Sequence, residues 1–350
     1  MRAVAYHAFQ GPVDVTRLAD PIPPPDGVVI AVEATGLCRS DWHGWQGHDP
    51  DIRTFPHVPG HEIAGRVAAV GGEVNRWRVG DRVTVPFVCG CGACPPCLRG
   101  DQQVCDRQTQ PGFTHWGSFA ELVAIRHADL NLVALPDQLD AVTAASLGCR
   151  FASAFRAVAS QGAVQPGEWV AVYGAGGVGL AAVMIARALG ARPIAVDISD
   201  AALELARNAG AEVVLRADHA DGVVLAIRDL TNGGADLSCD AIGSAPVVAD
   251  ALRSLRKGGR HVQVGLLAGS DADPAMPMSL VIARELTIVG SHGMAAHAYP
   301  RMLAMIADGR LDPARLITLT IPLGDAPGAL MTMVSDPHPG VTVIMPQLDA

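Results

Sequence analysis

The sequence has few aromatic side chains, no long apolar run and no run of positive charge. With aromatic residues at only 4%, each Trp or Phe near a motif becomes informative. No apolar segment reaches the roughly eighteen residues that a membrane-spanning helix needs, so we expect no membrane segment. The N-terminal MRAVAYHAF alternates like a strand and lacks the layout of a signal peptide, which predicts a cytoplasmic protein. A net charge of −9 argues against nucleic acid as a partner.

What the sequence does have is a dense cysteine segment, VCGCGACPPCLRGDQQVC, with five of the chain's eight cysteines. In a reducing compartment, clustered cysteines bind metal more often than they form disulfides. Cys91, Cys94, Cys97 and Cys105 follow the spacing C-x2-C-x2-C-x7-C, which suits a closed, tetrahedral, structural zinc site. An iron–sulfur cluster is the alternative, but nothing else in the sequence indicates electron transfer. Cys89 lies outside this spacing, and we expect it to bind no metal.

The pattern of the 350-residue chain changes near residue 150, which predicts two domains. Before it, short alternating runs such as VVIAVEATG, GRVAAVG and DRVTVPFV predict an irregular β domain, 1–149, which we expect 291–350 to join. Between 150 and 290 apolar strands alternate with helices, which predicts a doubly wound parallel sheet covered on both faces. The expected strands are WVAVYG, RPIAVD, EVVL, LSCDAI, RHVQVG and LTIVGS; the last of the expected helices, VADALRSLRKGG, ends in Gly like the others.

The first strand of this regular half runs into the glycine-rich loop GAGGVG and then into a helix. In that context Gly174 permits the tight turn, Gly176 lets the backbone approach a pyrophosphate and Gly179 lets the helix pack against the strand. Gly177 and Val178 complete the loop at a helix N-terminus, whose free N–H groups favour phosphate. The loop therefore predicts a dinucleotide site.

Asp197 ends the second strand, eighteen residues after Gly179. A carboxylate there accepts hydrogen bonds from the adenosine ribose and repels a 2′-phosphate. Ile198 and Ser199 follow and offer no Arg for such a phosphate, so NAD is favoured over NADP. The alternative is that the glycines form an ordinary turn and that Asp197 caps the next helix.

A second set of possible metal ligands lies in GLCRSDWHGWQGH and PGHEIAG. Cys38 and His61 are both suited to zinc, and Asp41 is placed to hold the far ring nitrogen of the histidine. With Cys149 as a third ligand, one coordination position would stay open, as in a catalytic zinc site. Spacing alone does not join Cys149 to the other two, and it is equally well read as a small buried residue.

CRSDWH, PGHEIAG, CGCGACPPCLRGDQQVC, Cys149 and GAGGVG, in this order, resemble the zinc-dependent alcohol dehydrogenases of the medium-chain dehydrogenase/reductase family over essentially the whole chain. The resemblance implies a GroES-like catalytic domain, a Rossmann coenzyme domain, NAD, two zinc ions per chain and a homodimer or homotetramer. It implies a catalytic zinc held by Cys38, His61 and Cys149, with Glu62 as an occasional ligand, and a structural zinc held by the four clustered cysteines. It further implies Ser40 and His43 as a proton relay and Arg39 as a partner of the coenzyme pyrophosphate.

The same resemblance implies a small alcohol or its aldehyde or ketone as substrate. Phe87, Trp45 and Trp116 fall where the family lines its pocket, and Cys149 as third ligand is typical of members that oxidise primary or simple secondary alcohols rather than polyols. Family members often carry an Arg shortly before the last strand, whereas HPGVTVIMP has none. Arg39, the helix N-terminus and backbone N–H groups would then meet the coenzyme charge.

Three other functions stay open on these residues. A polyol, threonine or formaldehyde dehydrogenase shares the scaffold, and a zinc-free quinone or enoyl reductase would need neither Cys38 nor His61. A non-enzymatic module that binds NAD or zinc would leave Ser40 and His43 without a purpose. Cys239 lies within LSCDAI and is expected in the core.

Overall fold

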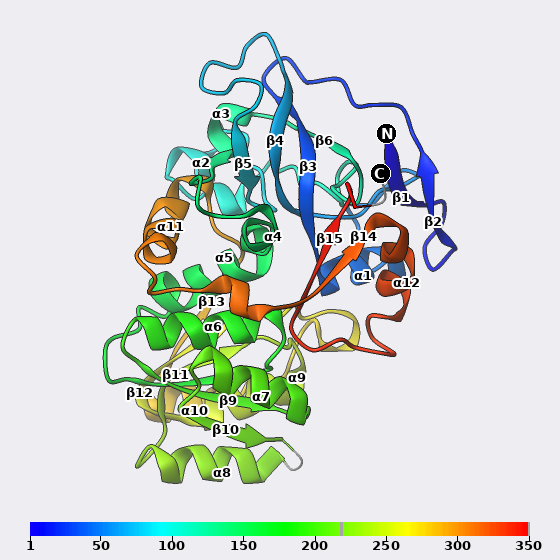
Figure 1. Cartoon of the computed structure of the whole chain (residues 1–350). Coiled ribbons are helices and arrows are strands. Elements are labelled where there is room, and N and C mark those ends of the chain that lie inside the picture. The colour runs from blue at the N-terminus through cyan, green and yellow to red at the C-terminus, as the bar shows by residue number, and fades with distance from the viewer. Residues whose placement is uncertain (218–219, 349–350) are drawn as a thin grey trace. The chain divides into compact units, whose positions relative to one another are not determined.

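The computed structural model describes residues 1–217 and 220–348, which form two compact units (Figure 1). The first unit comprises Met1–Ala152, Gly293–Leu303 and Ile317–Ala350, and the second comprises Ser153–His292 and Ala304–Leu316. The expectation that all of 291–350 joins the first domain is therefore wrong for 304–316. The reason is that the turn Pro313–Leu316, with Pro313 and Leu316 buried, packs against two helices of the second unit, and Arg315 donates a hydrogen bond to the carbonyl of Asn208.

The first unit is built on a seven-stranded sheet in the order β14-β15-β3-β4-β5-β7, with β6 also paired to β3, and on a separate β1-β2 pair. Its strands are β1 (Arg2–Tyr6), β2 (Val13–Arg17), β3 (Val28–Leu37), β4 (Glu62–Val70), β5 (Arg82–Val85), β6 (Leu122–Ile125), β7 (Val133–Ala134), β14 (Ile317–Pro322) and β15 (Val341–Met345). Its helices are α1 (Arg39–Gln46), α2 (Pro95–Leu98), α3 (Ala128–Asn131), α4 (Ala141–Ala145) and α12 (Ala326–Thr332). The chain passes between the units within α5 (Ala152–Phe155) and α11 (Tyr299–Ala307). The predicted irregular β domain is present.

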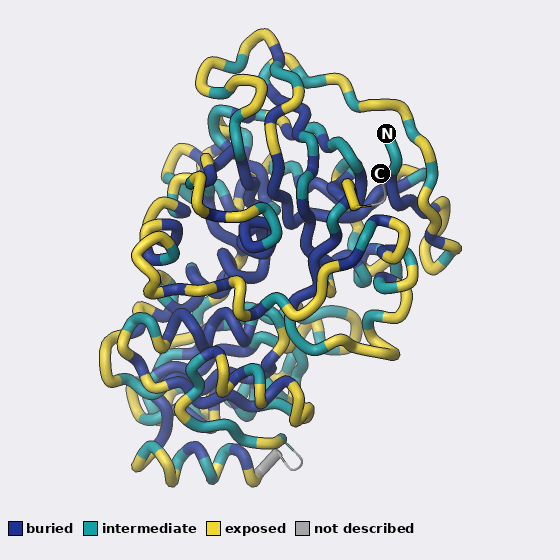
Figure 2. Tube along the Cα trace, in the orientation of Figure 1, coloured by how far each residue is buried: buried dark blue, intermediate teal, exposed yellow. Residues whose placement is uncertain are grey.

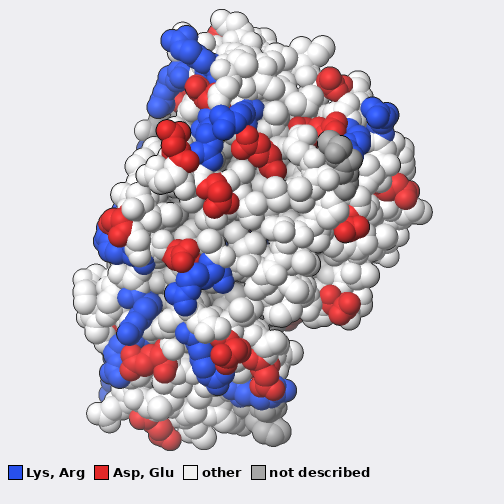
Figure 3. Space-filling model, in the orientation of Figure 1, with Lys and Arg blue, Asp and Glu red and all other residues white. Residues whose placement is uncertain are grey.

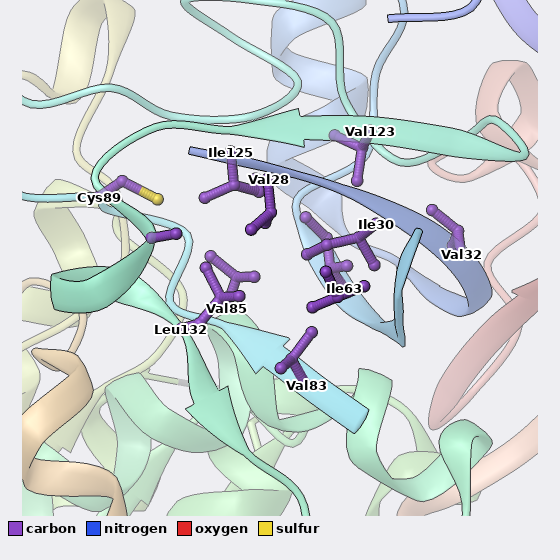
Figure 4. Close-up of a cluster of buried hydrophobic side chains, with 12 residues drawn as sticks. Val28, Ile30, Val32, Ile63, Val83, Val85, Cys89, Val123, Ile125 and Leu132 are labelled. Atoms are coloured by element: carbon purple, nitrogen blue, oxygen red, sulfur yellow. The ribbon is translucent and has the colours of Figure 1, made fainter. Parts of the chain in front are cut away.

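The core of this sheet is a cluster of β-branched side chains (Figure 4). Val28 and Ile30 of β3 point toward Ile63 of β4 and Val83 of β5, and all four are fully buried. Burying one such side chain stabilises the fold by about 1.5–3 kcal/mol. Cys89 belongs to the same cluster, and burial raises the pKa of its thiol to about 12, so it behaves as a small apolar residue.

The second unit is a six-stranded parallel sheet in the order β10-β9-β8-β11-β12-β13, with the first strand at the centre. This is the strand order of a Rossmann fold, and right-handed crossovers in two directions place helices on both faces. The strands are β8 (Trp169–Tyr173), β9 (Arg192–Asp197), β10 (Val213–Arg216), β11 (Ala235–Asp240), β12 (Leu255–Gln263) and β13 (Thr287–Gly290). The helices are α6 (Gly177–Ala188), α7 (Asp200–Ala209), α8 (Ala220–Leu230), α9 (Ala245–Arg253) and α10 (Met278–Arg284). All six predicted strands and the doubly wound sheet are confirmed.

One predicted helix end is wrong. The segment RKGG was expected to close the helix VADALRSLRKGG, but α9 ends at Arg253 and Leu255–Gln263 is strand β12. The strand begins early because Leu255 already pairs with Ala235 of β11, and the ladder then shifts register before Arg260. Gly258, with φ +70, lies within that irregular stretch.

Burial follows the strands of both sheets, and exposed residues gather in loops and on the outer faces of helices (Figure 2). On the face drawn in Figure 3, cations and carboxylates are interspersed between wide uncharged areas. No helix among the described residues is long and apolar enough to cross a membrane.

Candidate functional site

The fold of the first unit brings Cys38, His61 and Cys149 together. Cys38 is the N-cap of α1, His61 directly precedes β4, and Cys149 lies in a π-helical turn, Leu147–Phe151. The two sulfurs and one ring nitrogen of His61 lie within 4.8 Å of one another, and all three residues are buried. Cys149 is therefore part of a potential ligand set, a role that spacing alone did not establish.

Asp41 holds Cys38 and His61 in place through hydrogen bonds. Its Oδ1 accepts hydrogen bonds from His61 Nδ1 and the Gly60 N–H, and its Oδ2 accepts one from the Cys38 N–H, each at 2.9 Å. The predicted contact between Asp41 and the far nitrogen of His61 is present. Because Nδ1 is engaged by Asp41, Nε2 is the ring nitrogen left for a ligand, and this buried atom has no hydrogen-bond partner among the described residues. An unpartnered imidazole nitrogen beside two sulfurs is the donor set that zinc prefers.

A hydrogen bond between Cys38 and Cys149 shifts the pKa values of their thiols in opposite directions. The hydrogen bond from Cys149 holds the pKa of Cys38 well below its usual range, and the same bond holds the pKa of Cys149 well above it. One thiolate is thus already favoured before a metal arrives, which suits metal capture because thiolates are the binding form.

Glu62 is not part of the ligand set, although it follows His61 directly. Both its oxygens are occupied by Arg150: Oε1 accepts from the Arg150 N–H and Nε at 3.0 Å, and Oε2 accepts from Nε at 3.1 Å and from Nη2. Burial opposes the charge of Arg150, but Glu62 outweighs it and raises the pKa of Arg150 above its usual range. The implied role of Glu62 as an occasional ligand is not seen in this arrangement, because Arg150 holds its carboxylate.

The space around this pair is closed. A Cβ on Gly36 would lie 1.9 Å from Glu62 Oε2, so only glycine fits at this position of β3. No sequence pattern pointed to Arg150 or Gly36, because their roles arise only when β3, β4 and the π-helical turn meet.

Ser40 and His43 lie three residues apart on α1, so they share one face of the helix. Ser40 Oγ is 3.8 Å from Cys38 Sγ, close to the ligand set. His43 is half-buried, and its Nδ1 lies 3.0 Å from Nδ1 of the exposed His48. Burial, then Arg39, then His48 lower the pKa of His43, so it is a neutral proton acceptor at neutral pH. No sequence pattern identified His48 as its partner.

Of the three aromatic residues expected to line a pocket, Phe87 lies beside the ligand set, with its ring 6.1 Å from that of His61. Phe113, which was not predicted, is closer at 5.2 Å. Trp45 and Trp116 donate their indole N–H groups to the carbonyls of Gly11 and Pro56 and pack in two separate clusters. The rings of Phe87 and Phe113 form an apolar wall beside His61.

The second potential ligand set consists of Cys91, Cys94, Cys97 and Cys105, whose sulfurs lie within 4.8 Å of one another. The backbone N–H groups of Cys91 and Arg107 point at Cys105 Sγ at 3.3 Å, and Arg107 Nη2 lies 3.4 Å from Cys91 Sγ. These donors favour negative sulfur, and the Arg107 cation would offset part of the excess charge if four thiolates held a divalent ion here. Four ligands leave no open position.

The glycine-rich loop of the second unit has the geometry that its sequence predicts. Gly174 adopts φ +92, and a Cβ on Gly179 would lie 1.7 Å from the Gly174 carbonyl oxygen. A Cβ on Gly176 would meet nothing within 4 Å, so the backbone is open to a ligand there. Gly177 and Val178 begin α6, and the N–H groups of a helix N-terminus are suited to binding phosphate.

Asp197 at the end of β9 accepts hydrogen bonds from the N–H groups of Ala175 at 2.6 Å and Ser199 at 2.9 Å. The N-cap of α7 is Ser199, whose hydroxyl accepts from the Ala202 N–H. The alternative that Asp197 caps the next helix is therefore wrong. The carboxylate instead ties the end of β9 to the glycine-rich loop.

The sequence was compared with known families and proteins. Residues 24–137 match the alcohol dehydrogenase GroES-like domain, and residues 177–308 match the zinc-binding dehydrogenase family. The chain is 34% identical to an alcohol dehydrogenase of Geobacillus stearothermophilus over 83% of this chain and 84% of that one. It is also 34% identical to an NAD-dependent alcohol dehydrogenase of Sulfurisphaera tokodaii over 99% of this chain and all of the other.

Among solved structures, alcohol dehydrogenase TADH from Thermus sp. ATN1 superposes with a TM-score of 0.89 at 32% identity and covers 99% of both chains. The fold, the two ligand sets and these similarities agree, and the chain belongs to the zinc-dependent alcohol dehydrogenases of the medium-chain dehydrogenase/reductase family.

Proposed function

We propose that the protein transfers a hydride between NAD and a primary or simple secondary alcohol, with the aldehyde or ketone as substrate in reverse. The observation that carries this proposal is the buried set of Cys38, His61 and Cys149, in which His61 Nε2 has no protein partner among the described residues. It supplies three ligands and leaves a fourth position for the substrate oxygen. The NAD-dependent relative from Sulfurisphaera tokodaii supports the choice of coenzyme and reaction.

Zinc held by these three residues would polarise a bound oxygen, an effect that lowers the pKa of water from about 15.7 to about 7. The chain's own residues do the rest. Asp41 orients His61 and holds its tautomer. Phe87 and Phe113 limit access of water beside it, which strengthens electrostatic interactions at the site. The Ser40 hydroxyl would accept the proton of the alcohol as it passes its own proton on, and the neutral His43 would be the final acceptor of this relay.

In the coenzyme site, the loop from Gly174 to Gly179 would bind the pyrophosphate, and Asp197 would accept hydrogen bonds from the adenosine ribose. The second unit is then the coenzyme domain and the first the catalytic domain. Arg39, exposed at the start of α1, stays a predicted partner of the pyrophosphate.

The four clustered cysteines would hold a second, structural zinc ion, which makes two per chain. We infer a cytoplasmic location, where thiols stay reduced and can serve as metal ligands. A homodimer or homotetramer is proposed through the edge strand β13 and the helix α10 that precedes it in the chain, where Met278 and Ile282 are 52% and 75% exposed.

The proposal is tested by a spectrophotometric panel of alcohols and aldehydes with NAD and NADP, together with zinc quantification. Two zinc ions per chain and NAD-dependent oxidation of small alcohols are expected. Cys149→Ala should lose one zinc ion and Ser40→Ala should lower turnover far more than NAD binding. Retention of both ions by Cys149→Ala, or no activity with any substrate, would contradict the proposal. A preference for polyols, threonine or formaldehyde adducts would select the alternative on the same scaffold.

A further inference from the structure

A cavity of about 470 Å³ in the second unit is lined by Arg228, Gly233, Arg256, Lys257 and Arg284. These residues come from the end of α8, the following loop, the start of β12 and the end of α10. The glycine-rich loop follows the carboxyl end of β8, whereas β12 begins beside this cavity. Because the strands are parallel, the cavity lies at the opposite edge of the sheet from the coenzyme loop. It is therefore a separate feature of this unit.

The arginines of the cavity are held in place by backbone carbonyls. Arg284 Nη1 donates to the carbonyls of Arg253 at 3.0 Å and Leu255 at 2.8 Å, and Arg228 Nη1 donates to the same Leu255 carbonyl at 3.4 Å. In these bonds each guanidinium uses one of its three nitrogens, so further N–H groups remain for a ligand. Since the side chains are already ordered, binding costs little additional conformational entropy.

The cavity carries more positive charge than its neighbours offset. Of its four cations, Arg256 pairs with Asp236 through Nε at 2.5 Å, and no other ion pair joins a cavity cation to a described carboxylate. Burial and then the nearby Arg228 cation lower the pKa of Arg284. Of the two carbonyls, only that of Arg253 lies at a helix end, and the end of α9 carries only about half a negative charge. In a chain of net charge −9, such a cluster is not a general property of the surface.

We propose that this cavity binds a small molecule bearing phosphate groups. The planar guanidinium fork matches phosphate oxygens in a bidentate manner, and Lys257 adds a compact point charge beside it. The space beside Gly233 is open, because a Cβ there would meet nothing within 4 Å. The site does not depend on the dehydrogenase activity and is not the coenzyme site.

The chain offers an unusually direct test, because Lys257 is its only lysine. Pyridoxal 5′-phosphate, a phosphate-bearing aldehyde, forms an imine with an amine, and borohydride makes that link permanent. A second amine is the α-amino group of Met1, which donates to the Leu18 carbonyl and pairs with Asp20. Peptide mass spectrometry then reports Lys257 labelling, with the N-terminus as an internal reference.

Millimolar pyrophosphate should protect Lys257 at least about tenfold and leave the N-terminus unprotected, the effect of one to two charge-assisted hydrogen bonds. Arg284→Gln and Arg228→Gln should abolish that protection, whereas Arg310→Gln, at an exposed pair with Asp308, should not. Lys257→Met forms a second line of evidence, because no described hydrogen bond anchors this side chain. With the coenzyme site saturated by NAD, it should weaken pyrophosphate binding in calorimetry at least about tenfold with the fold intact.

Different competitors show how many phosphate groups the bound molecule carries. Protection by inorganic phosphate alone indicates a site for a single phosphate, and stronger protection by pyrophosphate or ATP indicates a di- or triphosphate. Equal protection by sodium chloride at the same ionic strength would overturn the proposal, as would unchanged protection of Lys257 by pyrophosphate in Arg284→Gln and Arg228→Gln. Neither outcome depends on enzyme turnover, so failure here leaves the proposed dehydrogenase function untouched.

Discussion

Arg150 and Glu62 form an ion pair in the interior of the first unit, with Arg150 Nε 3.0 Å from Glu62 Oε1 and 3.1 Å from Oε2. Each residue is the immediate neighbour of a proposed zinc ligand, Cys149 and His61. The pair neutralises a carboxylate that would otherwise be free to approach the metal. A change in the Arg150–Glu62 ion pair should therefore also affect the positions of the neighbouring ligands Cys149 and His61.

Removing one partner should be costly. Arg150→Met leaves the buried Glu62 carboxylate unpaired, and we expect it to lower the free energy of unfolding by about 3–5 kcal/mol. The double variant Arg150→Met/Glu62→Gln should recover part of that loss. Urea unfolding of the zinc-loaded protein measures both.

The matched control is Arg66→Met, which breaks a pair with Glu33 in which Arg66 is 50% exposed. It should cost less than about 1 kcal/mol. Equal effects of the buried and exposed substitutions would show that the Arg150–Glu62 pair has no special weight.

Asp41→Asn should weaken one zinc site selectively. The substitution removes the charge that holds the Nδ1 proton of His61, and such partners change metal affinity by about 10–100-fold. We expect faster zinc release to a chromophoric chelator from this site, with zinc at the four cysteines retained. Asp49→Asn, in the loop after α1, is the control, and loss of both ions in Asp41→Asn would mean general unfolding instead.

The pKa of His43 should rise when its neighbouring cations are removed. Arg39→Met should raise it more than His48→Gln, because Arg39 is the larger of the two charge effects on this pKa. The titration of the His43 ring by NMR, in coenzyme-free protein, measures each change. Arg53→Met, at a strongly exposed site, should leave it unchanged; an unaltered His43 pKa in all three variants would contradict the electrostatic cause.

Asp197→Asn should relax the choice of coenzyme. The neutral side chain repels a 2′-phosphate less, so the ratio of kcat/KM for NAD over NADP should fall at least about tenfold. Asp200→Asn removes an exposed carboxylate from the start of α7 and should leave that ratio unchanged. An unchanged ratio in Asp197→Asn would place coenzyme selection elsewhere.

His115 should make stability depend on pH. Burial lowers its pKa to about 4, whereas in the unfolded chain it is about 6.5. Between these values the unfolded state binds more protons, so the free energy of unfolding falls as the pH drops from about 6.5 to about 4, by about 3 kcal/mol. His115→Gln should show a shallower decline in urea midpoints over this range; parallel declines would exclude His115 as the cause.

The sheet of the second unit was predictable because its strands are buried on both faces and read as continuous apolar runs. The one error, at RKGG, arose because Gly residues after a helical pattern resemble a C-terminal cap, whereas pairing of Leu255 with β11 begins a strand there. Local signals cannot report such a pairing.

The site was predictable where its chemistry is local. The four clustered cysteines and the glycine-rich loop are each contained in one short segment. Asp41 could be predicted as the partner of His61 because it is a carboxylate close in sequence to Cys38, the other ligand upstream. His48 and Arg150 were not predictable, because their contacts depend on how a loop and a π-helical turn fold back.

That π-helical turn, Leu147–Phe151, constrains how this chain could be recombined with its relatives. Such a turn contains one residue more than an α-helical turn. Deleting a single residue would rotate the following side chains by about 100° around the axis. The same deletion would remove Cys149 from the ligand set and Arg150 from its contact with Glu62. Crossover points for chimeric enzymes therefore belong outside this segment, which should be exchanged as one block or not at all.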